Sequence, residues 1–381
     1  MTIPPQAVRA QASAGSLRIR WTDGSTSDIP SVWLRDNLPG NRDPGNGQRL
    51  LDIADLPPDP HIRKVEIDGD ELRVHWQDDA PPGVFALPWL RSRTASVDGR
   101  PENRRHLWLH GAQLQARRDF SWLGYDALRS DDKARLAWLT QLHVDGIAFL
   151  DDVPCVDAGI LDAMVHVGRV TETNYGRVFD VRTVGRPENL AYTDLGLGLH
   201  TDNPYREPVP GFQVLHALAS APEGGDSLFA DGHALALHLR ETAPEEFATL
   251  TSTPVPFFFR SADAELYAAR PLIQLTCDGT ISSVHYNNRS IAPLPATRGC
   301  EAFYRGYRRF ATLLRDPRFS LRTHLDDGQL VVFDNQRVLH GRTGFVSAVH
   351  PRHLRGCYLA RDSVASATSV LRRKLQEEPK T

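Results

Sequence analysis

The sequence predicts a mainly β protein with flanking helices, whose centre is an antiparallel barrel or a two-sheet roll. The first observation is a series of short strand-like runs broken by Gly, Pro and Asp. The second is composition: 41% of the 381 residues are hydrophobic and 24% are charged, which excludes a disordered or fibrous chain. The strand-like runs are residues 147–150, 212–218, 227–230, 255–259, 281–286, 329–333 and 356–360.

The first 95 residues contain a weak internal duplication. Residues 18–21 lead to Trp33-Leu-Arg35, and residues 73–76 lead in the same way to Trp89-Leu-Arg91. Each copy predicts an alternating strand, a turn, and a second strand that ends in a Trp-Leu-Arg corner. A polar stretch between residues 94 and 118 predicts a linker. We therefore expect a small N-terminal β domain over 1–105 and a second domain over 106–381.

Helices are expected to flank the strands of the second domain, at residues 130–142, 157–167, 234–250 and 301–314. The first of them has Asp131 and Asp132 in its first turn, followed by leucines at helical spacing. In the last, aromatic and leucine residues recur at helical spacing from Phe303 to Leu314. These patterns predict helices that pack against a core.

Charge and cysteine content exclude several classes of protein. The formal charge is −3, and the four cysteines are spread singly, which argues against a disulfide scaffold. The start has no apolar signal segment, and no apolar run reaches the roughly 20 residues of a membrane span, so we expect a soluble cytoplasmic protein without membrane contact. Arg305, Arg308, Arg309 and Arg315 indicate the solvated face of one helix rather than a nucleic-acid surface.

His200, Asp202 and His340 form the strongest candidate for a chemical site. Residues at i and i+2 of a strand point to the same side, so His200 and Asp202 can converge on one metal ion. An isolated His-x-Asp pair is weak evidence, because most such histidines are simply hydrogen-bonded. His340, after a later strand, supplies a third ligand, and Arg352 twelve residues on can bind a carboxylate through its fork. Two histidines and one carboxylate leave open positions on an octahedral ion, as in non-haem iron oxygenases.

The order of these motifs resembles the γ-butyrobetaine hydroxylase branch of the Fe(II)/2-oxoglutarate dioxygenases, which includes trimethyllysine dioxygenase and 2-trimethylaminoethylphosphonate dioxygenase. The resemblance covers nearly the whole chain, including the N-terminal β domain. The segments that carry it are Val32-Trp-Leu-Arg-Asp-Asn37, Asn189-Leu-Ala-Tyr192, His200-Thr-Asp202-Asn-Pro204, Gly211-Phe-Gln-Val-Leu-His216, Gly224-Gly-Asp-Ser227, Phe333-Asp-Asn335, Leu339-His-Gly-Arg342 and Arg352-His-Leu354.

The resemblance implies a double-stranded β-helix (jelly-roll) core with Fe(II) held by His200, Asp202 and His340 as the catalytic residues. It implies that Arg352 binds the far carboxylate of the cosubstrate 2-oxoglutarate and that Asn189 adds a second polar contact. O2 is the other cosubstrate, ascorbate is expected to stimulate turnover, and the family suggests a homodimer. The expected reaction is hydroxylation of an unactivated C–H bond.

The family's substrates carry a trimethylammonium head, which no side chain can hydrogen-bond. A cage of aromatic faces is the physical solution, because the ring faces attract a cation. The matching positions here are Tyr175, Phe179, Tyr192 and Tyr358; ordinary core packing is the alternative explanation for each of them.

The anionic tail of such a substrate needs donors, and two segments offer them. Asn203 and Tyr205 follow the His-x-Asp pair, and Asn287, Asn288 and Arg289 follow a predicted strand. A guanidinium beside two amides suits a phosphonate slightly better than a carboxylate. The sequence thus slightly favours hydroxylation of 2-trimethylaminoethylphosphonate next to phosphorus; the alternatives are hydroxylation of γ-butyrobetaine to carnitine and a solvated loop position for Arg289.

Two departures from the family pattern have consequences. Many relatives carry three zinc-binding cysteines in the N-terminal domain, whereas this chain has Leu38, Gly40 and Asp43 at those places, so we expect no zinc site there. Some relatives carry an aromatic residue where this chain has Asn203, which affects the geometry of the head-group cage.

Two other function classes are weighed against the oxygenase. A non-catalytic metal- or ligand-binding β-helix protein would retain the shell without turnover, but the intact set of metal and carboxylate ligands argues against it. A hydrolase would use Ser227 as its nucleophile, but no Gly-x-Ser-x-Gly elbow surrounds it, and a turn before a strand explains it better.

Overall fold

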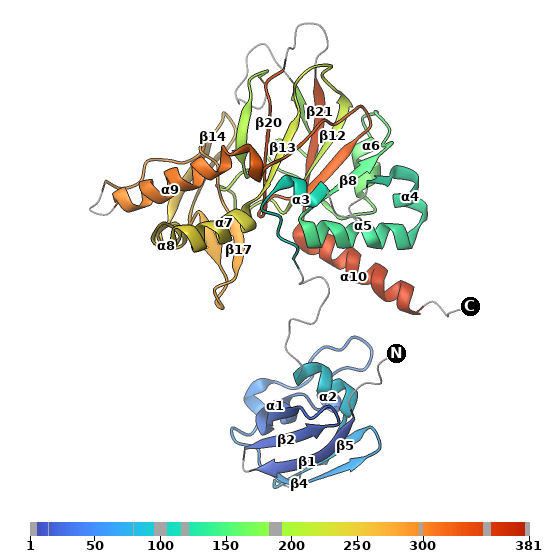
Figure 1. Cartoon of the computed structure of the whole chain (residues 1–381). Coiled ribbons are helices and arrows are strands. Elements are labelled where there is room, and N and C mark those ends of the chain that lie inside the picture. The colour runs from blue at the N-terminus through green and yellow to red at the C-terminus, as the bar shows by residue number, and fades with distance from the viewer. Residues whose placement is uncertain are drawn as a thin grey trace. The chain divides into compact units, whose positions relative to one another are not determined.

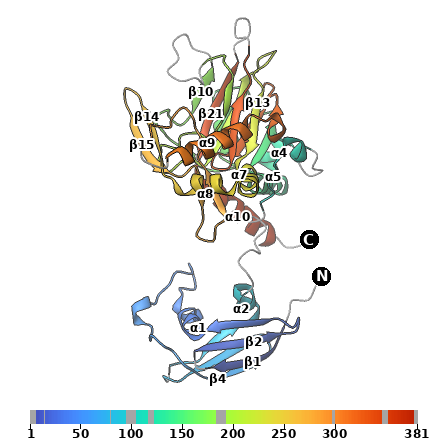
Figure 2. The same ribbon diagram turned by 60° about the vertical axis from the view of Figure 1, so that its left-hand side comes forward.

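The computed structural model divides into two compact units, Met1–Asn103 and Arg104–Thr381 (Figures 1 and 2). The structure describes residues 6–13, 15–78, 80–94, 105–115, 122–182, 193–296, 300–345 and 352–377.

The N-terminal unit repeats one motif twice: an antiparallel three-stranded sheet followed by a short helix. The Trp-Leu-Arg segments, predicted as strand ends, are instead inside these helices. The second strand of each copy ends earlier. Pro30 is the last residue of that strand in the first copy, and Pro88 is the second residue of the helix in the other copy, where its fixed φ suits a first turn. The elements are β1 (Ala7–Ser13), β2 (Ser16–Trp21), β3 (Thr26–Pro30), α1 (Ser31–Asp36), β4 (Ile62–Asp68), β5 (Glu71–Trp76), β6 (Gly83–Ala86) and α2 (Leu87–Thr94).

An arginine of each copy contacts a tryptophan of the other copy. The guanidinium carbon of Arg35 lies 4.9 Å from the centroid of the Trp76 ring, and that of Arg91 lies 5.1 Å from Trp21. Such cation–π contacts add stability to the burial of the rings, so each copy's arginine stacks on the other copy's tryptophan.

Hydrogen bonds organise the segment in which many relatives carry zinc-binding cysteines and this chain does not. The Asp43 carboxylate accepts from the backbone N–H groups of Gly45 and Asn46, both at 2.9 Å. An aspartate that accepts from the backbone two residues on stabilises a tight turn. A hydrogen-bonded turn therefore forms at one of the three replaced positions.

The second unit contains two sheets of a jelly roll, as the predicted fold class requires. In each sheet, strands distant in the sequence are neighbours, in the orders β10-β21-β12-β19-β8-β7 and β11-β20-β13-β18, and all these pairs are antiparallel except β7 with β8. The strands of the larger sheet are β7 (Leu123–Gly124), β8 (Ile147–Asp151), β9 (Val170–Thr171), β10 (Phe179–Arg182), β12 (Phe212–Ala219), β19 (Leu330–Asp334) and β21 (His353–Leu359). Those of the smaller sheet are β11 (Leu197–His200), β13 (Ser227–Asp231), β18 (Leu321–Thr323) and β20 (Val338–Arg342). Two hairpins complete the strands: β14 (Val255–Arg260) with β15 (Glu265–Arg270), and β16 (Ile273–Leu275) with β17 (Ile281–Val284).

Helices cover the sheets on two sides (Figure 1). α5, α6 and α10 lie beside β8, β12 and β21 of the larger sheet, and α7, α8 and α9 lie on the side of the smaller sheet. The helix predicted over 234–250 is two helices, because Pro244 cannot continue α7 and instead begins α8. The helices of this unit are α3 (Gly111–Gln115), α4 (Tyr125–Ser130), α5 (Asp132–Asp145), α6 (Gly159–Met164), α7 (Gly232–Thr242), α8 (Pro244–Ser252), α9 (Cys300–Leu314) and α10 (Arg361–Glu377). Within the described part of the chain, none of the helices is both long enough and apolar enough to cross a bilayer.

Side chains of both sheets form one hydrophobic cluster, which includes Phe149 and Phe333 of the larger sheet and Phe229 of the smaller. Trp108 is fully buried in this cluster, so residues 105–115 belong to the packed unit and the linker predicted there is wrong for them. A buried ion pair lies close by, in which the Arg337 guanidinium donates to Asp231 at 2.7 Å. Packing of this kind fixes the two sheets on which the candidate site is built.

Candidate active site

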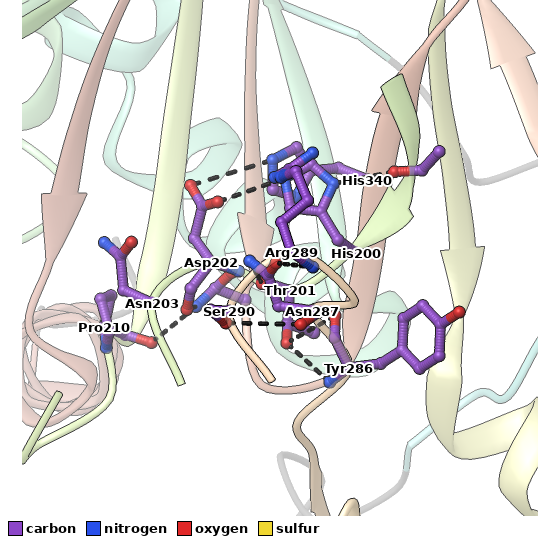
Figure 3. Close-up of polar contacts among 12 residues, drawn as sticks. His200, Thr201, Asp202, Asn203, Pro210, Tyr286, Asn287, Arg289, Ser290 and His340 are labelled. Carbon is purple, nitrogen blue, oxygen red and sulfur yellow. Dashed lines mark hydrogen bonds and ion pairs between the residues drawn. The ribbon is translucent and has the colours of Figure 1, made fainter. Parts of the chain in front are cut away.

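The predicted metal ligands come together at one end of the smaller sheet. His200 ends β11 and lies directly opposite His340 of β20, so that their rings are 4.2 Å apart between centroids. Asp202 follows in the turn, with Oδ1 3.3 Å from His200 Nε2 and Oδ2 3.9 Å from His340 Nε2 (Figure 3). Within the described residues, these three form the single group of His, Cys, Asp or Glu side chains with metal-ligand spacing.

The donor set fits a divalent ion such as iron. Three ligands on one face of an octahedral ion, with bonds of about 2.1 Å, lie about 3 Å apart, close to the observed separations. His200 Nδ1 lies 2.9 Å from the Gly198 carbonyl oxygen, and this hydrogen bond selects the tautomer whose Nε2 lone pair is free for a metal. The three side chains can therefore bind one ion after a small inward shift of their ligand atoms.

Electrostatics also favour ligation. Burial and the neighbouring His200 lower the pKa of His340 to about 3, so its imidazole is neutral at neutral pH. Burial alone would raise the pKa of Asp202, but His340, His200 and a hydrogen bond from Tyr358 hold it below its usual value. A neutral imidazole and an ionised carboxylate are the forms that bind metal ions.

The turn that carries Asp202 is fixed from two directions. The Asn335 amide accepts from the Asp202 backbone N–H at 2.7 Å and donates to the Asp202 carbonyl at 3.0 Å. On the other side, Thr201 N–H donates to the Tyr286 carbonyl at 2.7 Å, and the Asn287 amide donates to the Thr201 carbonyl at 3.0 Å (Figure 3). Side chains held by such supporting contacts keep a ligand set in place.

A pocket opens from the metal ligands and is lined from both sheets, with an empty volume of about 740 Å³ including its mouth. Aromatic and apolar side chains together with a few charged ones are typical of the lining of small-molecule sites. Besides the three metal ligands, its lining residues are Tyr175, Phe179, Val181, Leu197, Asn203, Gln213, Leu215, Ser227, Arg289, Gly341, Arg342, Arg352, Leu354 and Tyr358.

Arg352 lies in this pocket and is 5% exposed. Burial, with the nearby Arg342, lowers the pKa of Arg352 to about 10, so it stays charged at neutral pH. Gly225 makes room for it: with φ at +69°, a Cβ there would lie 2.9 Å from Arg352 Cδ. A buried cation beside a metal site is suited to an anionic ligand.

Three of the four predicted cage residues surround the same space. The Phe179 ring lies 6.3 Å from Tyr175 and 5.2 Å from Tyr358 between centroids, and all three line the pocket. The fourth, Tyr192, and the predicted cosubstrate contact Asn189 lie outside the described residues. The described cage thus presents aromatic faces beside the metal ligands.

The predicted tail donors are distributed differently. Arg289 lines the pocket, remains exposed, and lies beside His200 and His340 in Figure 3. Asn287 supports the metal-binding turn from below, and Asn288 accepts a hydrogen bond from Tyr307 at 2.6 Å.

The remaining two predicted donors are also held by protein partners. Asn203 is buried between two tyrosines: it donates to Tyr358 at 3.1 Å and accepts from Tyr205 at 2.6 Å. Tyr205 is 6% exposed. In the described structure, Arg289 is therefore the predicted donor best placed to meet a ligand.

Three polar pocket residues were missed by sequence reasoning as candidate ligand contacts: Gln213, Ser227 and Arg342. Gln213 is 3% exposed, and its Oε1 has no hydrogen-bond partner. Ser227, interpreted above as a turn residue, begins β13 and lies opposite Arg342 of β20. The signal available for Gln213 was its spacing of two from Leu215, which puts both on one face of a strand.

The chain is similar in sequence to described protein families and to curated relatives. Residues 111–358 match the family described as taurine catabolism dioxygenase TauD, TfdA family, and residues 8–91 match the N-terminal domain described as gamma-butyrobetaine hydroxylase-like. A gamma-butyrobetaine dioxygenase of Pseudomonas sp. (strain AK-1) is 33% identical over 97% of this chain and 97% of its own length. The Homo sapiens gamma-butyrobetaine dioxygenase is 29% identical over 97% of this chain and 98% of its own, and the mitochondrial trimethyllysine dioxygenase of Mus musculus is 27% identical over 91% and 84%. Among solved structures, a putative alpha-ketoglutarate-dependent taurine dioxygenase from Burkholderia xenovorans aligns with a TM-score of 0.47 and 15% identity, covering 63% of this chain and 85% of that one.

Proposed function

Because this chain belongs to the TauD/TfdA family of dioxygenases, with a γ-butyrobetaine hydroxylase-like N-terminal domain, we propose that it hydroxylates a small trimethylammonium compound with an anionic tail. The protein is a dioxygenase whose cofactor is Fe(II) and whose cosubstrate is 2-oxoglutarate. The aromatic cage beside the metal ligands is the observation that carries the choice of substrate class.

His200, Asp202 and His340 would hold the iron, and Arg352 would hold the far carboxylate of 2-oxoglutarate. The bound iron supplies oxidation by O2, coupled to conversion of 2-oxoglutarate to succinate and CO2. Apolar lining residues limit the access of water to the site. Among them, Leu215 and Leu354 come from neighbouring strands.

The cage explains how a cation without hydrogen-bond donors is bound. The faces of Tyr175, Phe179 and Tyr358 attract a quaternary ammonium group, and desolvation in a pocket strengthens the attraction. The substrate carbon next in the chain would then lie toward the metal ligands. Binding at the head thereby orients the C–H bond that is oxidised.

For the tail, we propose a carboxylate, as in γ-butyrobetaine, whose hydroxylation gives carnitine. The named activity of the Pseudomonas and human relatives supports this choice over the phosphonate that the sequence slightly favoured. The phosphonate is the second candidate, and Arg289 favours it, since this guanidinium lines the pocket together with Arg342 and can hold a doubly charged group.

A substrate panel tests the proposal. The purified enzyme with Fe(II), 2-oxoglutarate, ascorbate and O2 receives γ-butyrobetaine, trimethyllysine or 2-trimethylaminoethylphosphonate, and succinate and hydroxylated product are measured. We expect hydroxylated γ-butyrobetaine in amounts matching succinate. Product from the phosphonate alone would select the second candidate, and product from none of the three would reject the substrate class.

Arg289→Ala separates the two tails. It should raise KM for the phosphonate roughly 10-fold or more, because a charge-assisted contact is lost. Arg308→Ala, at an exposed position on α9, is the control and should leave KM unchanged. If Arg289→Ala leaves KM unchanged for both substrates, Arg289 does not bind the tail.

The homodimer and the cytoplasmic location stay predictions. Sedimentation or light scattering of the purified protein tests the first, and fractionation of the source cells tests the second.

A further inference from the structure

A continuous chain of side-chain hydrogen bonds runs from the aromatic cage to the metal-binding carboxylate. Tyr175 Oη lies 3.3 Å from Tyr205 Oη, and Tyr205 Oη donates to Asn203 Oδ1 at 2.6 Å. Asn203 Nδ2 donates to Tyr358 Oη at 3.1 Å, and Tyr358 Oη donates to Asp202 Oδ2 at 2.8 Å. We call these five side chains the tyrosine relay.

All hydrogen bonds of the relay are donated in the same direction, toward Asp202. An ionised carboxylate only accepts, so the Tyr358 hydroxyl donates its single proton to Asp202 and accepts a hydrogen bond from the Asn203 amide. The Tyr205 hydroxyl donates to the Asn203 oxygen, so Tyr175 is the donor in the hydrogen bond between the two tyrosines. Every donor and acceptor in the relay is thereby assigned.

The central link is built into the backbone. Asn203 has φ at +53°, a left-handed conformation that asparagine tolerates better than most residues with a Cβ. This conformation directs the chain sharply after Asp202, and the two ends of the Asn203 amide meet Tyr205 and Tyr358. An aromatic residue at this position could not bridge two hydroxyls in this way.

Four of the five relay residues line the pocket: Tyr175, Asn203, Tyr358 and Asp202. The fifth, Tyr205, is buried and stacks on the Phe259 ring, with 5.1 Å between the centroids. A cation bound against the Tyr175 and Tyr358 rings would therefore contact both ends of the series of hydrogen bonds. Tyr358 donates directly to Asp202, and Tyr175 is connected to it through Tyr205 and Asn203.

We infer that the tyrosine relay couples filling of the aromatic cage to the position of Asp202, so that 2-oxoglutarate is consumed chiefly when substrate is present. This inference rests on the proposed trimethylammonium substrate. Its residues act as positioning residues: Tyr205 and Asn203 reach the metal through Tyr358 and Asp202. Because hydrogen-bond networks of this kind polarise one another, loss of a central member weakens the whole relay.

The test uses Tyr205→Phe, which removes the central hydroxyl and leaves the Tyr358–Asp202 bond in place. Tyr307→Phe is the matched control, because it removes another tyrosine hydroxyl, one bonded to Asn288 outside the relay. Tyr175→Phe is a second variant, which keeps the aromatic face and removes the first donor. Thermal unfolding of each variant shows that it is folded.

The first readout needs no turnover. Anaerobic enzyme is loaded with Co(II) and 2-oxoglutarate, and its visible absorption spectrum is followed while γ-butyrobetaine or the phosphonate is added. We expect a change in the Co(II) bands in the wild type and in Tyr307→Phe, and loss of that change in Tyr205→Phe and Tyr175→Phe although calorimetry shows that they still bind the compound. A Co(II) response equal to wild type in both relay variants overturns the inference.

The second readout is the ratio of succinate to hydroxylated product with iron, where ascorbate supplies the electrons for cycles without product. We expect the ratio of uncoupled to coupled turnover to rise roughly 2-fold to 10-fold in the relay variants, as for loss of one hydrogen bond between neutral groups. Wild-type product formation tests the proposed function separately: if the wild type forms product and the relay variants keep its ratio, only the relay inference fails. If the wild type neither binds nor hydroxylates any trimethylammonium compound, both fail.

Discussion

Replacing Gly225 by alanine perturbs Arg352 in a way that can be worked out from the structure. A Cβ at this position would lie 2.9 Å from Arg352 Cδ and 3.1 Å from Nε. Carbon atoms normally approach to about 3.5–4.0 Å, so the guanidinium arm must move by about 1 Å. A misplacement of that size in a ligand-positioning group can cost roughly 100-fold. We therefore expect KM for 2-oxoglutarate to rise between about 10-fold and 100-fold.

The backbone strain of this variant needs its own control. Gly225 has φ at +69°, and alanine in that region costs about 1–2 kcal/mol of stability. Gly279 has φ at +81° with no heavy atom within 4 Å of the added Cβ, so Gly279→Ala carries the strain without the collision. The assay is succinate formation at varied 2-oxoglutarate, alongside urea unfolding of both variants. A wild-type KM in Gly225→Ala would refute the placement of 2-oxoglutarate against Arg352.

Three further changes test the rest of the structure. Arg337→Met leaves the buried Asp231 carboxylate without its cation, and should lower the free energy of unfolding by about 3–5 kcal/mol in urea titrations; a loss near zero would contradict this pairing. Gly356→Ala would place a Cβ into the Phe179 ring, and should raise KM for the trimethylammonium substrate while KM for 2-oxoglutarate stays the same; equal effects on both would argue against the cage. Burial lowers the pKa of His285 from 6.5 to about 3. Below pH 6.5 the unfolded chain therefore binds a proton at His285 that the folded protein does not bind, so the free energy of unfolding falls as pH falls. The slope is about 1.4 kcal/mol per pH unit below pH 6.5, and His285→Gln should flatten the dependence measured by urea unfolding between pH 7 and pH 5.

Part of the candidate metal site could be predicted from local evidence, because His200 and Asp202 are two residues apart at the end of a strand. His340 was expected after a strand and a turn, whereas the structure places it inside β20, a strand that was not predicted. What the sequence could not provide is the cross-strand register that sets His200 opposite His340. Register depends on the packing of whole sheets, so it appears only in the structure.

The predicted substrate donors illustrate the opposite case. Asn203 and Asn287 are polar residues beside the metal site in both sequence and space, yet their amides are engaged with Tyr358 and Thr201. The sequence alone does not distinguish an asparagine that hydrogen-bonds the protein from one that hydrogen-bonds a ligand. Their partners distinguish them, and those partners lie more than 80 positions away in the chain.

The predicted boundaries of helices and linkers were wrong where a single residue determined the structure against the surrounding sequence pattern. The apolar spacing over 234–250 continues across Pro244, so periodicity alone predicts one helix where proline imposes two. Trp108 lies in a polar stretch that resembles a linker, but burial of its large ring anchors residues 105–115 to the core. In both cases a single side chain determines the local structure.

Oxidation of a trimethylammonium compound at the site of His200, Asp202 and His340 can be followed by isotope labelling. The enzyme is given γ-butyrobetaine, Fe(II) and 2-oxoglutarate under ¹⁸O2, and both products are measured by mass spectrometry. We expect one labelled oxygen in the succinate and one in the hydroxylated compound, in equal molar amounts, and neither product from His340→Ala. Labelled succinate without any hydroxylated trimethylammonium compound, from γ-butyrobetaine or from the phosphonate, would contradict it.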